Sequence, residues 1–150
     1  MKKENLLISA CLFGIPCRYD GRSVKKIEIE ALKEKYNLVP VCPEIYGGLT
    51  TPRRPSEQRD GGVFMDDGTD VSENFIRGAE CAYSLALALD CQKALLKERS
   101  PSCGKGRVYD GSFTGTLCDG YGVCAEYLIS RGISVYGESR ISELLGEKEE

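Results

Sequence analysis

The chain has 150 residues and a net charge of −3 at neutral pH. A chain of this length can bury about 70% of its unfolded surface, so we expect one domain over residues 1–150 that folds without disulfide bonds. Acidic and basic residues are intermixed along the chain, which argues against a large nucleic acid partner. A small anionic ligand stays compatible with this charge, because one local pair of arginines can bind it.

Export and membrane insertion are not expected. The tetrapeptide Ile8-Ser9-Ala10-Cys11 mimics a lipoprotein processing site, but the apolar stretch before it is shorter than the roughly 7 residues that a signal peptide needs. No apolar run approaches the roughly 20 residues that cross a bilayer. Eight cysteines in a chain with an adequate core fit a reducing cytoplasm better than a secreted disulfide scaffold. The sequence carries no signal for the oligomeric state.

Short apolar runs alternate with helix-like segments along the chain. In chain order we expect a strand at 6–10, a helix at 27–36, a strand at 38–41, a helix at 71–89, a strand at 94–97, a helix at 122–130, a strand at 133–136 and a helix at 141–147. This alternation predicts an α/β fold, a Rossmann-like parallel sheet flanked by helices with right-handed crossovers. A strand order of 2-1-3-4 would place the first three strands side by side.

Several local signals refine this outline. Pro40 indicates that the second strand is short or lies at an edge of the sheet. Residues 43–69 are rich in glycine and proline and predict a long irregular functional loop with one hairpin near residues 63–65. Asp70 and Glu73 match a capping box at the start of a helix. Tyr-Asp-Gly occurs at 19–21 and again at 109–111, which two Asp-Gly turns explain.

Three cysteines occupy equivalent places in this scheme. Cys11, Cys42 and Cys103 each follow a predicted strand, at the start of a loop rich in glycine or proline. Because the carboxyl ends of neighbouring parallel strands meet at one sheet edge, where open α/β folds bind ligands, we expect the three thiols to converge there.

The converging thiols have two interpretations. The chain lacks histidine, which excludes histidine-based catalysis. It also contains no Cys-x-x-Cys, which argues against zinc ribbons, thioredoxin-like dithiols and ferredoxin runs. Three thiolates suit a cubane iron-sulfur cluster in which one iron has no protein ligand and acts as a soft Lewis acid. The alternative is that these are buried cysteines that pack as small hydrophobic residues.

Three blocks of sequence carry a family resemblance. They are Ser9-Ala10-Cys11-Leu12-x-Gly14-x-x-Cys17-Arg18-Tyr19-Asp20-Gly21, then Cys42-Pro43-Glu44 with Gly47-Gly48-Leu49 and Thr51-Pro52-Arg53-x-Pro55-x-Glu57, and finally Ser100-Pro101-Ser102-Cys103-Gly104 with Tyr109-Asp110-Gly111. In this order they resemble the signature of the thiouracil desulfidase family over residues 9–132, nearly the whole chain.

The resemblance implies non-redox desulfuration of a thiolated pyrimidine on a 4Fe-4S cluster held by three cysteines. Carried over by motif, the ligands are Cys11, Cys42 and Cys103, the catalytic carboxylate is Glu44 and the catalytic serine is Ser100. Substrate sulfur would bind the open iron, water would attack the ring carbon, and uracil or UMP and hydrosulfide would leave. This chemistry needs a group that takes a proton from water and returns one to the ring, a role that suits Glu44.

Other positions keep two interpretations. Ser100 serves catalysis or caps its loop, and Ser102 is an alternative to it. Arg53 contacts substrate or a phosphate group, or it braces its loop against an acidic residue such as Glu57. Lys105, between two glycines, is a second phosphate candidate, so 4-thiouridine monophosphate is expected to be a better substrate than free 4-thiouracil.

Two questions concern the cysteines and the activity. Cys17 could replace Cys11 as a ligand, whereas Cys81, Cys91, Cys118 and Cys124 are expected to be packing or incidental thiols. Two other functional classes stay open: a structural or regulatory cluster or zinc module without turnover, and an enzyme that transfers sulfur through a cysteine persulfide.

Overall fold

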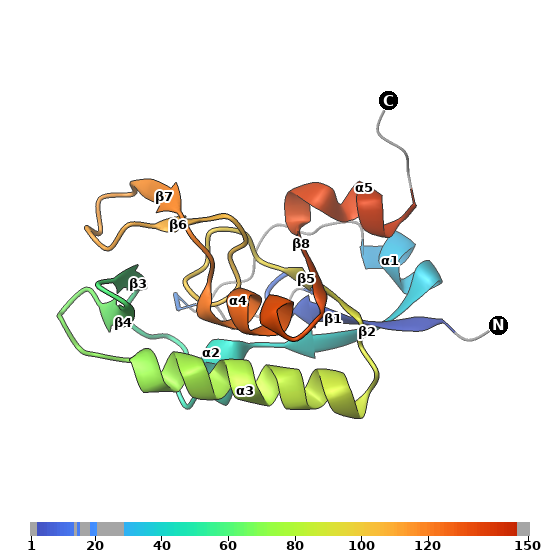
Figure 1. Ribbon diagram of the computed structural model, residues 1–150, viewed down its shortest axis with the longest axis horizontal. Helices are drawn as coiled ribbons and strands as arrows, with labels where there is room; N and C mark the ends of the chain where they lie inside the picture. Colours follow the sequence, from blue (N-terminus) through green and yellow to red (C-terminus); the bar gives the residue numbers. More distant parts are fainter. Residues whose placement is uncertain (1–2, 14, 16–18, 21–28, 147–150) are drawn as a thin grey trace.

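The structure, a computed structural model, describes residues 3–13, 15, 19–20 and 29–146. Its centre is a parallel sheet in the order β2-β1-β5-β8 (Figure 1). The strands are β1 (Glu4–Ser9), β2 (Tyr36–Val41), β5 (Lys93–Leu96) and β8 (Ser134–Gly137). The predicted order is therefore confirmed, and with it the α/β class and the Rossmann-like arrangement.

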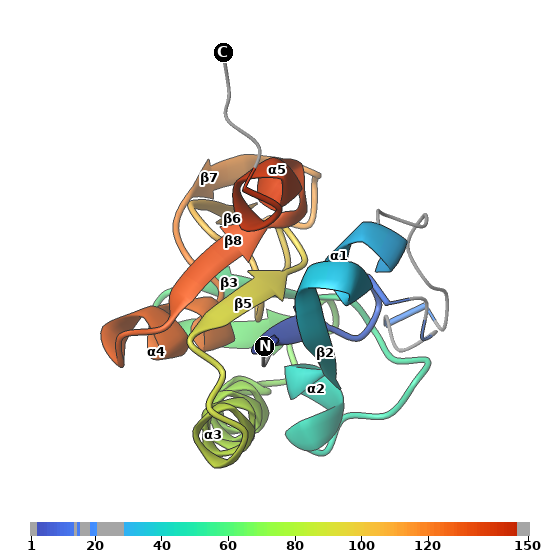
Figure 2. The same ribbon diagram turned by 90° about the vertical axis from the view of Figure 1, so that its right-hand side faces the viewer.

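Helices cover both faces of this sheet (Figure 2). The helices α3 (Ser72–Ala88) and α4 (Val123–Ser130) pack on one face, where Ala82 and Leu128 join Leu7 in a buried cluster. The helices α1 (Ile29–Lys35) and α5 (Ile141–Leu144) pack on the other face against Leu6 and Ile8. The central strand β1 is thus covered on both sides, as its continuous apolar run predicts.

The edge strand β2 begins earlier than expected. Tyr36 belongs to this strand and not to the preceding helix, because it pairs with Glu4 in the sheet. Its buried ring brings the hydroxyl to the carbonyl oxygen of Leu144, to which it donates at 2.7 Å, and this bond anchors α5. The edge position agrees with Pro40. The other elements differ from the expected ranges by one to three residues at their ends, where helices and strands fray.

The long segment after β2 contains more structure than expected. A short helix α2 (Pro43–Tyr46) was not predicted, whereas the predicted hairpin is present as β3 (Ser56–Arg59) and β4 (Gly62–Met65). The predicted capping box is wrong. Val71 is the N-cap residue of α3, and no side-chain hydrogen bond caps this helix. The carboxylate of Asp70 instead accepts the N–H of Ser72 at 2.9 Å.

Sequence analysis predicted the Asp-Gly turn of a second hairpin but not its two strands. This hairpin consists of β6 (Arg107–Tyr109) and β7 (Leu117–Asp119), which are antiparallel and joined by a turn rich in glycine, serine and threonine. Strands of three residues are too short to show an alternating pattern. The hairpin extends from the carboxyl end of the sheet, beside the β3–β4 hairpin (Figure 1).

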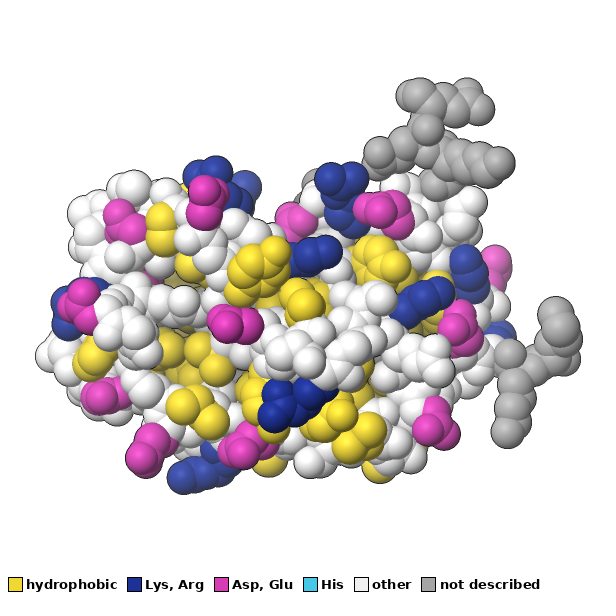
Figure 3. Space-filling model, in the orientation of Figure 1, with side chains coloured by type: hydrophobic (Ala, Val, Ile, Leu, Met, Phe, Trp, Pro, Cys, Tyr) yellow, Lys and Arg dark blue, Asp and Glu magenta, His cyan; other side chains and the backbone are white. Residues whose placement is uncertain are grey.

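The surface is mixed in charge. On the face shown in Figure 3, acidic and basic side chains are interspersed, with hydrophobic side chains exposed between them. In the described part of the chain, no helix is both long enough and apolar enough to cross a membrane.

Candidate active site

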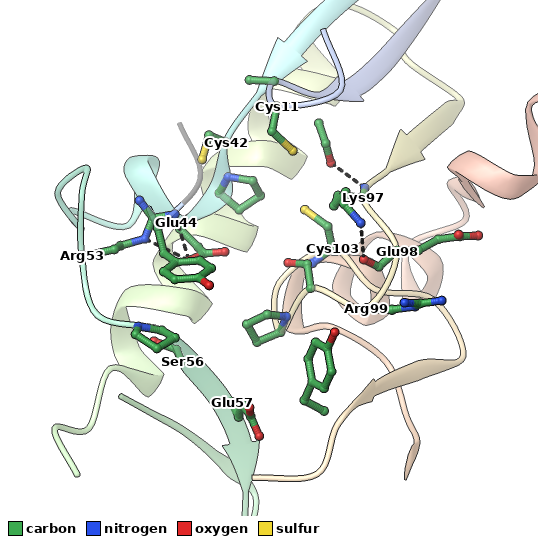
Figure 4. Close-up of a pocket in the computed structure, with 18 of the residues that line it drawn as sticks. Cys11, Cys42, Glu44, Arg53, Ser56, Glu57, Lys97, Glu98, Arg99 and Cys103 are labelled. Atoms are coloured by element: carbon green, nitrogen blue, oxygen red, sulfur yellow. Dashed lines mark hydrogen bonds and ion pairs between the residues drawn. The ribbon is translucent and has the colours of Figure 1, made fainter. Parts of the chain in front are cut away.

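The three strand-end cysteines line one cavity of about 510 Å³. Figure 4 shows Cys11, Cys42 and Cys103 around the same space. Cys11 and Cys42 closely follow the ends of β1 and β2, and Cys103 lies further along, in the loop after β5. Cys11 and Cys103 are buried and Cys42 is half-buried. The convergence that strand topology predicts is present, and the cavity has the size of a small-molecule site.

Local hydrogen bonds fix the loop that carries Cys103. The hydroxyl oxygen of Ser100 accepts the N–H groups of Ser102 at 3.1 Å and of Cys103 at 3.0 Å. Gly104 donates its own N–H to the Ser100 carbonyl oxygen at 2.9 Å. A Cβ at Gly104 would lie 2.8 Å from that carbonyl, so the turn is closed too tightly for a larger residue. Ser100 therefore caps its loop, as one of the two interpretations expects, and it also lines the cavity.

The three thiols fit a cluster better than a single ion. Among the residues that the structure describes, no three cysteine or carboxylate side chains lie close enough together to hold one metal ion. A 4Fe-4S cube is larger than one ion, and each cysteine binds a different iron, so its ligands are spread around a space. Thiols from three strand ends around a shared cavity meet this requirement.

The environment of Cys103 favours the protonated thiol. Burial raises its pKa well above the ordinary value, and the neighbouring sulfurs of Cys124, Cys11 and Cys42 raise it further. A hydrogen bond from Ser9 opposes this shift. Because only the thiolate binds metal, cluster binding at this site must release protons.

Glu44 lies on α2, two residues after Cys42, and pairs with Arg53 from the long loop (Figure 4). Its Oε1 accepts from the Arg53 Nε at 3.1 Å and lies 3.0 Å from Nη2. Burial raises the pKa of the Glu44 carboxyl, and the ion pair with Arg53, which lowers it, offsets this only in part. A carboxyl group with a raised pKa is suited to carry a proton near neutral pH.

Arg53 is a brace within its loop. Its side chain is 4% exposed, and its Nη1 also donates to the Thr50 carbonyl oxygen at 3.0 Å and to Thr51 Oγ1 at 3.1 Å. The acidic partner is Glu44; Glu57 accepts backbone N–H groups of the β6–β7 turn instead. This geometry supports the brace that sequence analysis offers as one alternative, and the phosphate contact stays a prediction.

Two further candidates lie outside the cavity lining. Ser102 is fully buried and its Oγ has no hydrogen-bond partner in the described structure. Lys105 donates from Nζ to the Val135 carbonyl oxygen at 2.9 Å, near the sheet edge. Neither side chain is among those that line the cavity. Their predicted contacts with substrate therefore gain no support from the geometry.

The remaining cysteines separate into two groups. Cys91 and Cys124 are buried in the apolar cluster under α3 and α4, whereas Cys81 and Cys118 are exposed. The alternative ligand Cys17 lies outside the described residues.

Sequence analysis missed the aromatic residues of the cavity. Tyr19, Tyr109 and Phe113 line it together with the cysteines. The repeated Tyr-Asp-Gly was the available signal, since both of its tyrosines contact the cavity. Phe113 gave no signal, because it lies in a turn whose position depends on tertiary contacts.

A comparison with protein families matches residues 6–140 to the family described as 2-thiouracil desulfurase. The chain belongs to this family. Among solved structures, this 2-thiouracil desulfurase family member is similar to a 4Fe-4S-dependent thiouracil desulfidase, TudS, with a TM-score of 0.89 and 44% identity over 95% of each chain. It is also 35% identical to the uncharacterized protein YbbK of Bacillus subtilis (strain 168), over 93% of this chain and 99% of that protein.

Proposed function

We propose that this protein is a 4Fe-4S-dependent thiouracil desulfidase. The single observation that carries the proposal is the convergence of Cys11, Cys42 and Cys103 on one cavity that also contains Glu44. The likeness to TudS supports it, since that protein is a 4Fe-4S-dependent thiouracil desulfidase and shares 44% of its residues with this chain.

The cluster would be held by the three strand-end cysteines. When bound, it supplies a soft Lewis-acidic iron without a protein ligand, which has affinity for the sulfur of a thiocarbonyl group. The net reaction adds one water to thiouracil, so that the C=S bond becomes C=O and sulfur leaves as hydrosulfide. No electrons are exchanged with an external donor or acceptor.

Glu44 would serve as the acid-base group. In its ionised form it accepts a proton from the attacking water, and it then returns this proton to the ring nitrogen or to the departing sulfur. Arg53 holds the carboxylate through Nε and Nη2, which leaves Oε2 as the oxygen not engaged in this pair. The Arg53 side chain is 4% exposed and that of Glu44 is 17% exposed, which limits exchange of this proton with bulk water.

Ser100 would orient the substrate. A hydroxyl oxygen has two acceptor lone pairs and one donor hydrogen. The two lone pairs of Ser100 accept the backbone N–H groups of Ser102 and Cys103. The remaining hydrogen is available to donate to an oxygen or nitrogen of the pyrimidine.

The substrate is a thiopyrimidine, and the geometry around Arg53 favours the free base. The guanidinium group is engaged with Glu44, Thr50 and Thr51, so a nucleotide phosphate would have to displace a buried ion pair. We therefore expect free 4-thiouracil to be used at least as well as 4-thiouridine monophosphate. Comparing kcat/KM for the base, the nucleoside and the monophosphate tests this directly, and a tenfold preference for the monophosphate would restore the phosphate contact.

We also propose that the protein works in the reducing cytoplasm. Cys81, Cys91, Cys103, Cys118 and Cys124 are free thiols in the structure. A cluster with an open iron site would be lost easily under oxidising conditions.

Anaerobic reconstitution with iron and sulfide is the decisive experiment. We expect about four irons and four sulfides per chain, from the cluster stoichiometry, and release of uracil and hydrosulfide from 4-thiouracil. If the cluster-loaded protein releases neither product, the alternative of a structural or regulatory cluster without turnover is favoured. A colourless zinc-loaded protein, or turnover through a cysteine persulfide without iron, would refute the proposal.

A further inference from the structure

The turn of the β6–β7 hairpin contributes aromatic surface to the cavity. Tyr109 at the end of β6 and Phe113 in the turn both line it, and both are half-buried. The same cavity holds the three cysteines and Glu44, so this aromatic surface belongs to the space that a substrate would enter. The roles proposed for the cysteines, Glu44 and Ser100 do not require an aromatic residue in this cavity.

The backbone at Phe113 has an unfavourable conformation. Its φ angle is +57°, in the left-handed region that residues other than glycine rarely adopt. Such strain persists only where surrounding contacts enforce it, and it is concentrated at functional sites.

Glu57 on β3 holds the turn from the cavity side. Its Oε1 accepts the N–H of Gly111 at 2.9 Å and the N–H of Phe113 at 3.2 Å. Glu57 also lines the cavity, and Figure 4 shows its side chain at the edge of the pocket. One carboxylate oxygen therefore fixes the backbone on both sides of Ser112 and sets the direction from which Phe113 enters the cavity.

Two further features make the turn rigid. Gly111 has a φ of +94°, and a Cβ there would lie 2.6 Å from the Gln58 carbonyl oxygen, so the turn sits directly on the backbone of β3. On the exposed side, a chain of side-chain hydrogen bonds runs from the Asp110 carboxylate through the hydroxyl groups of Ser112 and Thr114 to that of Thr116. The oxygen–oxygen distances are 2.5, 2.6 and 2.9 Å. The backbone at Phe113 is consequently held in place before any ligand arrives.

A planar heteroaromatic ring is the ligand that this surface suits. Pyrimidines stack on aromatic side chains, and such stacking depends on the flat π-face of the base and not on its substituents. An aromatic surface would therefore hold the ring, while the groups near the cysteines act on its sulfur. Stacking alone would not distinguish 2-thiouracil from 4-thiouracil.

We propose that Phe113 is a substrate-binding residue on which the thiopyrimidine ring stacks, and that Glu57 is the positioning residue that fixes Phe113 there. This inference rests on the proposed function and adds to it the residue that recognises the ring. Attack by water makes only the sulfur-bearing carbon tetrahedral and leaves the other ring atoms nearly coplanar, so stacking stabilises the ground state and the transition state to a similar extent. Its loss should therefore raise KM and leave kcat nearly unchanged.

The first test compares Phe113→Leu and Phe113→Tyr in cluster-loaded protein. Leucine is not β-branched and tolerates the backbone as phenylalanine does, but it lacks a π-face. We expect KM for 4-thiouracil to rise about 5- to 150-fold in Phe113→Leu, the range that base stacking is worth, with kcat within about twofold. Phe113→Tyr should stay close to wild type. Tyr121→Leu is the matched control, because Tyr121 is 42% exposed and does not line this cavity.

A second test uses Glu57 and a readout independent of turnover. Glu57→Ala should weaken binding as Phe113→Leu does, whereas Glu57→Gln keeps a carbonyl oxygen as acceptor and should rescue most of the affinity. Equilibrium titration with uracil, which carries no sulfur, measures the stacking surface in loaded and cluster-free protein. Melting temperatures are recorded in parallel. If Glu57 had only a structural role, its replacement would lower the melting temperature without changing the affinity for uracil.

The outcomes distinguish this inference from the proposed function. If wild type converts 4-thiouracil and Phe113→Leu has unchanged KM and uracil affinity, the stacking surface is refuted while the activity stands. If loaded wild type converts no thiopyrimidine but uracil binds and Phe113→Leu weakens it, the activity fails while the surface is supported. If uracil does not bind to the wild-type protein at all, the proposal of a stacking surface is refuted.

Discussion

At the scale of single residues, the three strand-end thiols carry the proposal. Replacing Cys11, Cys42 or Cys103 by alanine should abolish retention of the intact cluster, because each removes one of three anchoring bonds. Iron and sulfide content after anaerobic reconstitution measures this. The exposed Cys81 and Cys118 provide matched controls that should load normally. Iron at the wild-type level in Cys42→Ala would refute the assignment, and Cys17→Ala decides between Cys11 and Cys17.

Glu44 allows a prediction about rate. Glu44→Gln should keep the cluster and slow turnover by roughly 10² to 10⁴, about 3 to 5 kcal/mol of barrier, since an amide cannot carry the proton. The glutamine carbonyl can still accept from Arg53, so folding should be preserved. Single-turnover rates normalised to iron content provide the measurement. A turnover rate near that of wild type would make Glu44 a structural residue.

At the scale of elements, two glycines allow α2 to reach its place on α3. A Cβ at Gly78 of α3 would lie 1.8 Å from the Pro43 carbonyl oxygen, and one at Gly47 would lie 1.9 Å from that of Asn74. The backbones of the two helices therefore touch, and this contact positions both Cys42 and Glu44 at the N-terminal end of α2. The short helix gains its stability from this packing, because four residues do not form a helix alone.

This contact predicts an unusual response to alanine. In a helix interior, Gly→Ala normally stabilises by about 1 kcal/mol. At Gly78 we expect the opposite, a loss of about 1 to 3 kcal/mol, because the methyl group displaces α2. Urea unfolding of the apoprotein gives the free energy, and Ser84→Ala on the exposed side of α3 is the control. A stabilised Gly78→Ala protein would show that α2 can move without cost.

At the scale of the whole molecule, burial of Cys124 predicts a dependence of stability on pH. Burial raises its pKa from 9.0 to about 12, so the folded state keeps the thiol protonated where the unfolded state ionises it. Stability is therefore unaffected below about pH 9 and falls as pH rises toward 12, by roughly 2 kcal/mol between pH 9 and 10.5. Denaturant unfolding at pH 8 and at pH 10.5 measures this effect. Between the two pH values, the free energy of unfolding should fall less for Cys124→Ala than for wild type. Equal losses in both proteins would contradict the prediction.

The sequence predicted the fold where its signals were local. Continuous apolar runs separated by amphipathic segments identify parallel strands and their order, and the strand order brings the cysteines together. What it missed depends on contacts between distant segments. Tyr36 joins a strand because it pairs with Glu4 of β1, and the Glu44–Arg53 pair and the Phe113 turn exist only once the long loop has packed. No periodicity in the chain encodes such contacts.

The placement of the three cysteines after three separate strands has a thermodynamic consequence. A cofactor bound to all three would tie together segments that are remote along the chain, much as a branched covalent cross-link would. It binds the folded chain and finds no such arrangement in the unfolded one, so its binding energy adds to the stability of the fold. Cluster loss and unfolding are then linked equilibria: oxygen that strips the iron also loosens the carboxyl edge of the sheet, and proteolysis there would report on cofactor occupancy.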